Sequence, residues 1–273
     1  MDKNLTKTKT LIGMIHVPAL PGTPSNTLSP DQILEVVMNE ARIYSECGVN
    51  TIILENMHDL PYLKRTCGPE IVSLMSILCF QVKNKYFKDK LVGVQILAGC
   101  NKQSLAVAYN SGCDFIRAEG FVFASIADEG FMDADAGELL RYRKQIGADK
   151  IKIFTDIKKK HSANLITDDV KIGDFAENAE FCMSDGIIVS GSSTGKESSL
   201  EDLDCVRKQC KLPILIGSGI TVNNLEKYFD HADAFIVGTY FKKDGNWKNE
   251  LDVERIKSLV ELFEKLCKQQ SKK

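Results

Sequence analysis

The sequence predicts an α/β protein with one domain, a (β/α)8 barrel in which eight parallel strands alternate with eight helices. Short apolar runs recur eight times along the 273 residues, and each is followed by a segment with helical periodicity. The chain can also fill a large core, because 44% of its residues are hydrophobic. We expect a single barrel domain over residues 1–273, with a short flexible N-terminus at 1–9 and a C-terminal tail at 268–273.

The eight apolar runs are rich in β-branched residues and are bounded by Gly, Pro, Asn or Asp. Short runs of this kind are typical of buried parallel strands. In chain order, the expected strands are Leu11–Val17, Thr51–Glu55, Val92–Leu97, Asp114–Glu119, Ile151–Asp156, Gly186–Ser190, Pro213–Ile216 and Ala234–Val237.

A helical pattern follows each run. Pro30 and Pro69 stand early in the first two patterns, where proline is favoured. Gly48, Gly112 and Gly147 stand just after the first, third and fourth patterns, as expected at helix ends. The expected helices are Ile33–Tyr44, Ile71–Val82, Lys102–Asn110, Gly137–Ile146, Ile172–Cys182, Leu200–Gln209, Val222–Tyr228 and Val253–Cys267.

A doubly wound open sheet is the main alternative to the barrel. Such sheets commonly carry a Gly-rich first turn that binds a dinucleotide. The first turn here is Pro18-Ala19-Leu20-Pro21-Gly22, which cannot present a row of N–H groups to a pyrophosphate. The sequence therefore favours the barrel and argues against hydride transfer with a dinucleotide.

The charge balance and the apolar runs argue against two classes of partner. Lys and Arg number 35 and Asp and Glu number 37, so the formal net charge is −2. This balance argues against a nucleic-acid binder that neutralises phosphates. No run approaches the ~18 consecutive apolar residues of a membrane span. Barrels often dimerise, so a homo-oligomer is compatible with the sequence, although no motif marks an interface.

The nine cysteines are scattered singly, without a C-x-x-C pair. This usage favours reduced thiols over a zinc site or a disulfide framework. The first residues contain neither an apolar signal segment nor an Arg, so we expect a cytoplasmic protein, with a mitochondrial location as the alternative.

Polar residues stand at the carboxyl ends of the expected strands. In a barrel these ends converge on one mouth, which is where barrel enzymes hold their active sites. A ring of ion pairs that closes the barrel top is the structural alternative. Period-2 alternation places Ile12, Met14 and His16 on one face, and likewise pairs Phe115 with Arg117 and Glu119, and Phe154 with Asp156. The candidates at the mouth are His16, Glu55, Asn56, Gln95, Arg117, Glu119, Asp156, Lys158, His161, Ser190, Ser218 and Thr239.

Gly-rich turns follow the last two strands, which is where barrels commonly hold a phosphate. Gly217-Ser218-Gly219-Ile220-Thr221 follows strand seven, and Gly238-Thr239 follows strand eight. Glycine lets backbone N–H groups approach an anion, and Thr221 could cap a helix whose positive end adds to the site. Ser190 and Gly191 after strand six could supply further donors. Tight turns with no ligand are the alternative.

The segment Asp156–His161 combines a carboxylate, three lysines and an imidazole, which suits proton transfer. A solvated basic loop is the alternative. His16, Glu55 and Asp156 could also hold a divalent metal, but no dense ligand spacing supports one, and we expect no cofactor.

Distinctive motifs are spread over nearly the whole chain, from about residue 11 to residue 266: Ile12–Gly22, Leu54–Pro61, Cys67–Glu70, Phe115–Gly120, Gly137–Arg143, Asp156–His161, and Ser190-Gly191 with Thr194-Gly195. Together they resemble the motifs of the BtpA family. The stretch Gln95–Gly99 departs from the bacterial pattern, where Asn and Arg are usual, and is more similar to an animal branch of the family.

The resemblance implies a TIM barrel related to phosphate-binding barrels. The family takes its name from a role in photosystem I biogenesis, which an animal-type member cannot perform. A related member in a bacterial sugar-metabolism operon points to phosphorylated small molecules.

Two functions therefore follow as hypotheses. The first is an enzyme acting on a phosphorylated small molecule, a sugar or nucleoside phosphate, by isomerisation, aldol-type cleavage or hydrolysis. In it, His16, Glu55, Asp156 and His161 supply acid–base groups, and Arg117 and Glu119 orient the reacting end. Asn56, Gln95 and Lys158 add ligand contacts, and an Asp156→Asn variant should lose activity but keep its fold. The second is an assembly factor that uses the barrel as a scaffold, which would need an exposed apolar patch.

Overall fold

The computed structural model describes residues 8–158, 162–163, 165–191 and 197–271. Its main strands are β1 (Thr10–His16), β2 (Thr51–Glu55), β3 (Leu91–Gln95), β4 (Phe115–Ala118), β7 (Lys152–Ile157), β9 (Gly186–Val189), β10 (Ile214–Ile216) and β11 (Ala234–Val237). These eight parallel strands close into a barrel in the order β1-β11-β10-β9-β7-β4-β3-β2. Each expected apolar run forms one of them, so the predicted barrel is confirmed.

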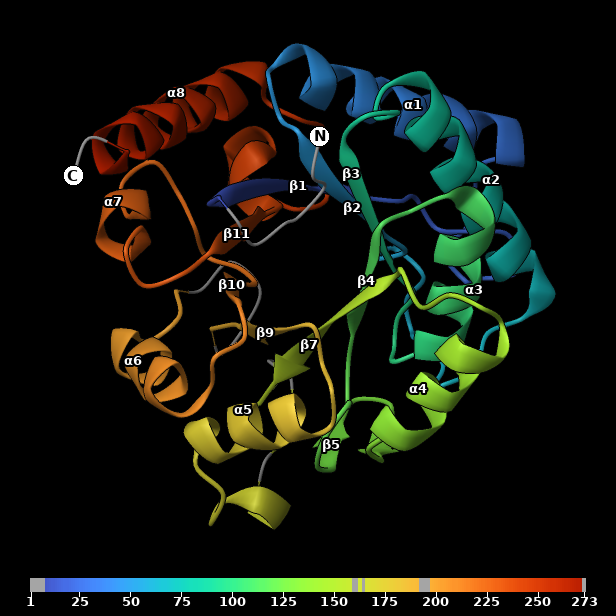
Figure 1. Ribbon diagram of the computed structural model, residues 1–273. Coiled ribbons are helices and arrows are strands. Elements are labelled where there is room, and N and C mark those ends of the chain that lie inside the picture. The colour runs from blue at the N-terminus through green and yellow to red at the C-terminus, as the bar shows by residue number, and fades with distance from the viewer. Residues whose placement is uncertain (1–7, 159–161, 164, 192–196, 272–273) are drawn as a thin grey trace.

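A layer of helices surrounds the barrel (Figure 1). They are α1 (Pro30–Glu46), α2 (Pro69–Lys85), α3 (Asn101–Ser111), α4 (Ala136–Gln145), α5 (Ile172–Phe181), α6 (Leu200–Gln209), α7 (Leu225–Tyr228) and α8 (Val253–Gln270). The ends of the helices differ from expectation by up to three residues. α7 is a single turn that starts at Leu225 instead of Val222, and α8 continues to Gln270, so residues 268–270 of the expected tail are helical.

A small antiparallel sheet lies beyond β4, and the sequence did not predict it. It consists of β5 (Ser125–Ala127), β6 (Gly130–Met132) and β8 (Ser162–Ala163), in the order β6-β5-β8. β5 and β6 form a hairpin whose tip is Asp128 and Glu129. The strands are only two or three residues long, so they carry too little periodicity to be read from the sequence. Short 3-10 helices add η1 (Leu165–Thr167), η2 (Thr239–Phe241) and η3 (Lys243–Gly245).

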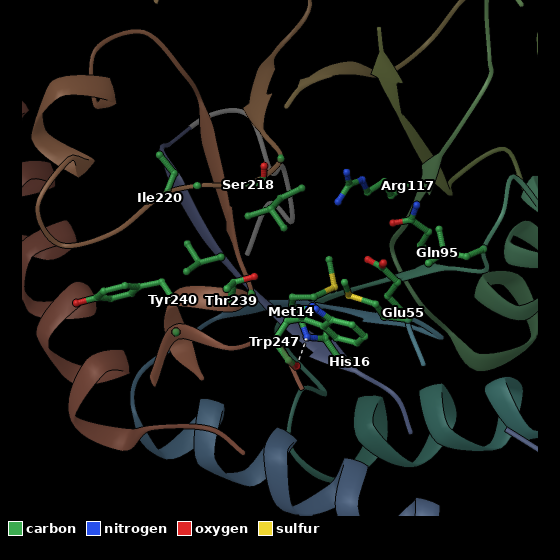
Figure 2. A pocket seen from close by; sticks show the side chains of 18 of the residues that line it. Met14, His16, Glu55, Gln95, Arg117, Ser218, Ile220, Thr239, Tyr240 and Trp247 are labelled. Carbon is green, nitrogen blue, oxygen red and sulfur yellow. Dashed lines mark hydrogen bonds between the residues drawn. The ribbon is translucent and has the colours of Figure 1, made fainter. Parts of the chain in front are cut away.

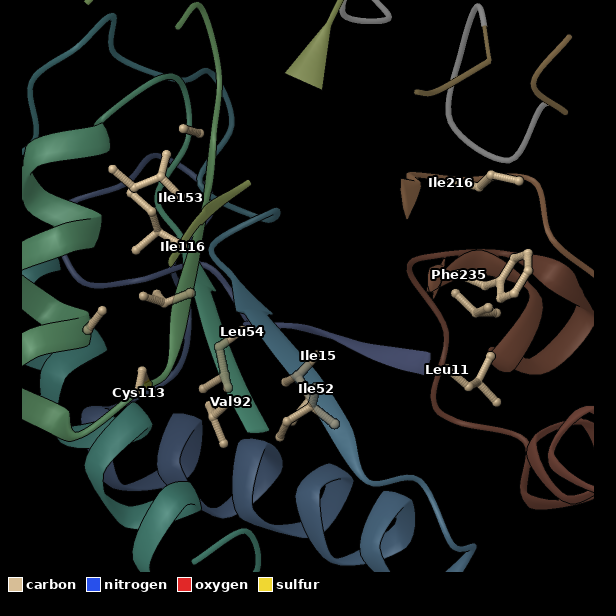
Figure 3. Close-up of a cluster of buried hydrophobic side chains, with 14 of the residues drawn as sticks. Leu11, Ile15, Ile52, Leu54, Val92, Cys113, Ile116, Ile153, Ile216 and Phe235 are labelled. Carbon is tan, nitrogen blue, oxygen red and sulfur yellow. The ribbon is translucent and has the colours of Figure 1, made fainter. Parts of the chain in front are cut away.

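The strand side chains form two apolar regions. Those that point outward pack against the helices in a large cluster that includes Ile15, Leu54, Val92, Ile116 and Ile153 (Figure 3). Those that point inward fill the lower part of the barrel in a second cluster, which consists of Ile12, Met14, Ile53, Phe115, Phe154, Ile188, Leu215, Ala234 and Ile236. The barrel interior is therefore packed at one end and leaves its carboxyl end for polar groups.

Local signals fix where the helices begin and end. At the start of α1, the Ser29 hydroxyl accepts a hydrogen bond from the Gln32 backbone N–H, and the Gln32 side chain accepts one from the Ser29 N–H. This reciprocal capping, with Pro30 in the first turn, specifies the helix start. α3 ends at Gly112, which has a φ of 73° that glycine adopts without strain.

All nine cysteines are free thiols, and four of them are buried. Among the helices in the described ranges, none combines the length and apolar character that crossing a bilayer requires.

Candidate functional site

A cavity of about 610 Å³ opens at the carboxyl ends of the strands. Its volume lies in the range of small-molecule sites. The predicted mouth residues that line it come from six strands or the turns that follow them: His16, Glu55, Gln95, Arg117, Glu119, Gly217, Ser218, Gly219, Gly238 and Thr239.

The cavity has two chemically different sides. Ser218 and Thr239, from the turns after β10 and β11, lie on one side (Figure 2). Glu55, Gln95 and Arg117, from β2, β3 and β4, lie on the opposite side (Figure 2). One side thus offers small hydroxyl and backbone groups, whereas the other offers charged side chains and a carboxamide.

Strand register places the polar side chains of β1, β2 and β3 at the same height in the barrel. His16 pairs with Glu55 across β1 and β2, and Glu55 pairs with Gln95 across β2 and β3. Residues in register on neighbouring parallel strands point to the same side of the sheet. The predicted alternation is therefore confirmed: Ile12 and Met14 lie in the inner apolar cluster below His16, and Phe115 lies there below Arg117.

The imidazole of His16 is oriented by the loop after β11. Its Nδ1 lies 3.3 Å from the backbone oxygen of Trp247. A carbonyl oxygen only accepts, so Nδ1 carries a hydrogen, and Nε2 is the nitrogen that can take up a proton. Trp247 also packs against the rings of His16 and His58, at centroid distances of 6.1 and 4.8 Å. This geometry suits His16 to act as a general base.

Arg117 and Asp156 form a buried two-point ion pair. Arg117 Nε lies 2.7 Å from Asp156 Oδ2, and Nη2 lies 2.8 Å from Oδ1. Both side chains are almost fully buried, at 6% and 2% exposed. Burial alone would lower the pKa of Arg117, but Asp156 and then Glu55 and Glu119 outweigh it, so the pKa lies above its ordinary value. Arg117 is therefore a fixed cation that lines the cavity.

The pair changes the role expected for Asp156. Both of its oxygens are occupied by Arg117, and Asp156 does not contribute to the described cavity wall. Its position suits it to hold Arg117 in place. An Asp156→Asn variant would leave the buried guanidinium without its counter-charge, so the expectation that this variant keeps its fold is revised.

Hydrogen bonds between loops hold Glu119 and the rim. The Glu119 carboxylate accepts a hydrogen bond from the Gly99 backbone N–H at 2.8 Å. Arg65 donates to the backbone oxygens of Gly99 and Glu119 and to the carboxylate of Asp135, which joins the loops after β2, β3 and β4. Burial raises the pKa of Asp135 to about 6, although Arg65 and Asn101 oppose the shift.

The turns after β10 and β11 bring backbone to the other side of the cavity. Gly219 has a φ of 80°, which side-chain-bearing residues rarely adopt. A Cβ atom on Gly238 would lie 2.9 Å from His16 Nε2, so a larger residue there would have to displace the His16 ring. The predicted helix cap at Thr221 was wrong, because the cap of α7 is Asn224 and the helix is one turn long. Such a short helix adds little dipole, so anion binding at this side depends on the turns themselves.

Five described candidates lie outside the cavity wall. Asn56 donates to Asp59 and accepts from the Leu97 N–H, so it braces two loops. The amine of Lys158 lies 5.4 Å from the centre of the Phe175 ring, against α5. Ser190 has a buried hydroxyl without a hydrogen-bond partner. The five are Asn56, Asp156, Lys158, Ser190 and Gly191, and His161 lies outside the described residues.

Several residues of the cavity wall that lie beyond the strand ends escaped sequence reasoning. Tyr62 stands in the loop after β2, Asp128 and Glu129 form the hairpin tip, and Trp247 lies in the loop after β11. They are remote from any strand end, so a rule based on strand ends misses them. A signal did exist for Trp247, because it is the only tryptophan in the chain and follows the last strand.

Among the described residues, no group of three or more His, Cys, Asp or Glu side chains is placed to hold a metal ion. The trio of His16, Glu55 and Asp156 is not assembled, because Asp156 faces Arg117.

The profile of the BtpA family matches residues 7–265 of the chain. An uncharacterized protein of Caenorhabditis elegans, whose name includes the word mitochondrial, is 51% identical over 95% of each chain. The photosystem I biogenesis protein BtpA of a Synechocystis species is 31% identical, over 92% of this chain and 86% of its own length.

Solved structures share the barrel. The thiamine phosphate pyrophosphorylase of Pyrococcus furiosus superposes with a TM-score of 0.57 over 96% of this chain and 98% of its own, at 14% sequence identity. Identity this low shows the shared fold and leaves the reaction to be argued from the site.

Proposed function

The chain belongs to the BtpA family, and from that premise and the geometry of its mouth we propose that it is an enzyme acting on a phosphorylated small molecule by acid–base chemistry. The observation that carries the proposal is the opposition of two sides in one cavity. Backbone-rich turns after β10 and β11 face Glu55 of β2 across it (Figure 2). His16 Nε2 and Arg117 Nη2 reach toward these turns, beside the Cβ positions of Gly238 and Gly217.

The phosphate belongs on the side of Gly217, Ser218, Gly219, Gly238 and Thr239. Backbone N–H and hydroxyl donors suit an anion, and barrels commonly hold a phosphate at the last two strand ends. The thiamine phosphate pyrophosphorylase, whose barrel is similar, has a phosphate compound in its name. This arrangement leaves the reacting end of the ligand toward Glu55, with His16 Nε2 beside Gly238 at the border between the two sides.

Acid–base groups face that reacting end. His16, with its hydrogen on Nδ1, takes up a proton at Nε2, and Glu55 lies beside it on the neighbouring strand. Arg117 stabilises negative charge that develops on the ligand, because its own charge is fixed in place by Asp156. These groups suit proton transfer next to a carbonyl, as isomerisation and aldol-type cleavage require.

Ligand binding tests the proposal. The full chain is screened by thermal shift and by Trp247 fluorescence against inorganic phosphate, sugar phosphates and nucleoside monophosphates. Because Trp247 is the only tryptophan and lines the cavity, a bound ligand should change its emission. Bound ligands should also raise the melting temperature by mass action.

Substitution at the phosphate side supplies the control. Gly219→Asp places a carboxylate where the anion approaches and should weaken the binding of a phosphorylated ligand by about tenfold or more. Gly48→Asp is the matched control, because Gly48 has a similar φ of 84° but follows α1, away from the cavity wall. Equal affinity of both variants, with wild-type affinity retained, would exclude this phosphate site.

A second candidate is an assembly factor, in line with the word biogenesis in the name of the Synechocystis relative. Exposed apolar side chains on segments around the mouth favour it, chiefly Leu63 at 64% and Leu165 at 84% exposed, with Phe131 nearby on β6. In this function, Leu63→Asp and Leu165→Asp would abolish capture of a partner protein and leave ligand binding intact. Loss of ligand binding with partner capture unchanged would count against it.

Cytoplasm remains our proposed location, and the name of the worm relative gives mitochondria as the alternative. Fractionation of cells that express the full chain with a C-terminal tag distinguishes the two.

A further inference from the structure

Gln95 presents a buried carboxamide oxygen that has no donor. The residue is 2% exposed and lies on β3, where it lines the cavity beside Glu55. No hydrogen-bond partner reaches its Oε1 atom. Buried amide oxygens in folded proteins nearly always accept a hydrogen bond, so an unpaired one at a cavity wall indicates that a ligand supplies the donor.

A second unpaired acceptor reaches the same cavity from above. Glu129 stands at the tip of the β5–β6 hairpin and lines the cavity, and its Oε2 atom is buried without a partner. The two acceptors come from different elements, a strand and a hairpin. Both open into one cavity, so a ligand that fills it can offer hydrogen-bond donors to both.

Charge at this end of the cavity is predominantly negative. Glu55, Glu119, Asp128 and Glu129 line it together with Arg117, which Asp156 already matches. The other arginine of the described cavity wall, Arg255, stacks on Tyr240. The same carboxylates act on Tyr62. Burial is the largest cause that raises the pKa of Tyr62, and the carboxylates of Glu55, Glu119 and Glu129 raise it further. A cationic group is therefore favoured there over a neutral one.

We propose that the ligand carries a protonated primary amine at the end away from its phosphate, bound by Gln95, Glu129 and the neighbouring carboxylates. An ammonium group offers three donors and one positive charge, whereas a hydroxyl offers one donor and no charge. The inference rests on the proposed function for the phosphate end, and it narrows the substrate class to phosphorylated amines such as amino sugar phosphates.

Matched ligand pairs test the proposal. In each pair an ammonium replaces one hydroxyl: D-glucosamine 6-phosphate with D-glucose 6-phosphate, and phosphoethanolamine with 2-hydroxyethyl phosphate. A wider panel of phosphorylated compounds, half of them with a primary amine, is screened by thermal shift on the full chain. We expect the amine member of a binding pair to bind at least about tenfold more tightly, and the hits to be enriched in amines.

Variants assign the preference to the named residues. Glu129→Gln should reduce the preference to within about twofold, because it removes the charge that favours the ammonium member. Glu264→Gln removes the same charge from the exposed face of α8 and should leave the preference at its wild-type value. Gln95→Met removes the second acceptor at similar volume and should weaken amine binding in the same way.

The outcomes separate the two proposals. If the fraction of compounds without an amine is the same among the hits as in the whole panel, the amine inference is overturned and the phosphate proposal stays in place. A preference that survives both variants would overturn the assignment to Gln95 and Glu129. Equal binding of glucosamine and glucosamine 6-phosphate would overturn the phosphate proposal, and the absence of any phosphorylated hit would end both.

Discussion

Phe115 and Arg117 stand two residues apart on β4, and they belong to different environments. Phe115 packs on Phe154 at a centroid distance of 5.5 Å inside the lower barrel, whereas Arg117 lines the open cavity above. The same step occurs from Phe154 to Asp156 on β7, and from Ile53 to Glu55 on β2. Stability and ligand chemistry are therefore divided between the two ends of each strand, as barrels allow.

The Arg117–Asp156 pair is the strongest exception to this division. It belongs to the upper region, but it is buried and should contribute to stability as well. Asp156→Asn removes one charge and leaves the guanidinium unpaired, which should lower the free energy of unfolding by about 3–5 kcal/mol. Ligand binding should be lost with it, since Arg117 is no longer held. Urea denaturation measures the first effect, and Trp247 fluorescence titration measures the second.

Asp149→Asn is the matched control, because its pair with Lys144 is exposed, at 58% and 81%, and spans 3.5 Å. Its effect should stay below about 1 kcal/mol. A small effect of Asp156→Asn, equal to that of the control, would show that the upper region does not depend on this pair for stability.

Asp135 offers a test of the polar upper region through pH. Its pKa is raised from 3.8 to about 6 by burial, so the folded state binds a proton between these values that the unfolded state releases. Stability from this group is therefore greatest at low pH and falls as pH rises through about 6, by roughly 2–3 kcal/mol in all.

An Asp135→Asn variant isolates that contribution. Asparagine carries no charge to desolvate, so the difference between variant and wild type in the free energy of unfolding should grow as pH rises from about 4 to about 7. Urea denaturation at several pH values measures it. A difference that does not change with pH would mean that Asp135 titrates at its ordinary pKa.

More of the packed lower region than of the upper region could be predicted from the sequence. Period-2 alternation in runs such as Leu11–Val17 depends only on burial, so it correctly placed Ile12 and Met14 inside the barrel. The same alternation placed His16 at the mouth, and its position at a strand end placed Glu55 there. Both side chains could be located because the strands themselves position them.

Loops carry the parts that could not be predicted. Glu129 and Trp247 reach the cavity from a hairpin and from a segment beyond the last strand, and no periodicity relates them to a strand end. Asp156 was expected at the mouth but lies outside the cavity wall, because both of its oxygens contact Arg117, and such a contact is a tertiary property. The amine of Lys158, expected at the mouth, instead packs on Phe175.

Gly93 and Gln95 give the sharpest version of the comparison, because they are two residues apart on β3. A Cβ atom on Gly93 would lie 2.2 Å from the Phe115 ring, so Gly93→Ala should destabilise the lower barrel by about 1–3 kcal/mol. Gln95→Met, in the upper region, removes a buried acceptor that has no partner and should raise the free energy of unfolding slightly, by about 1 kcal/mol.

Ligand affinity should change in the opposite way to stability in these two variants. Gly93→Ala should leave the affinity for phosphorylated ligands at its wild-type value below the melting temperature, because its effect is confined to packing around Phe115. Gln95→Met should weaken binding although the protein is more stable, which a purely structural role for Gln95 would not produce. Thermal melts and fluorescence titrations on the two variants side by side measure both properties. If stability and affinity fell together in both variants, the two ends of β3 would be coupled, and the division between a packed base and a ligand-binding mouth would not hold.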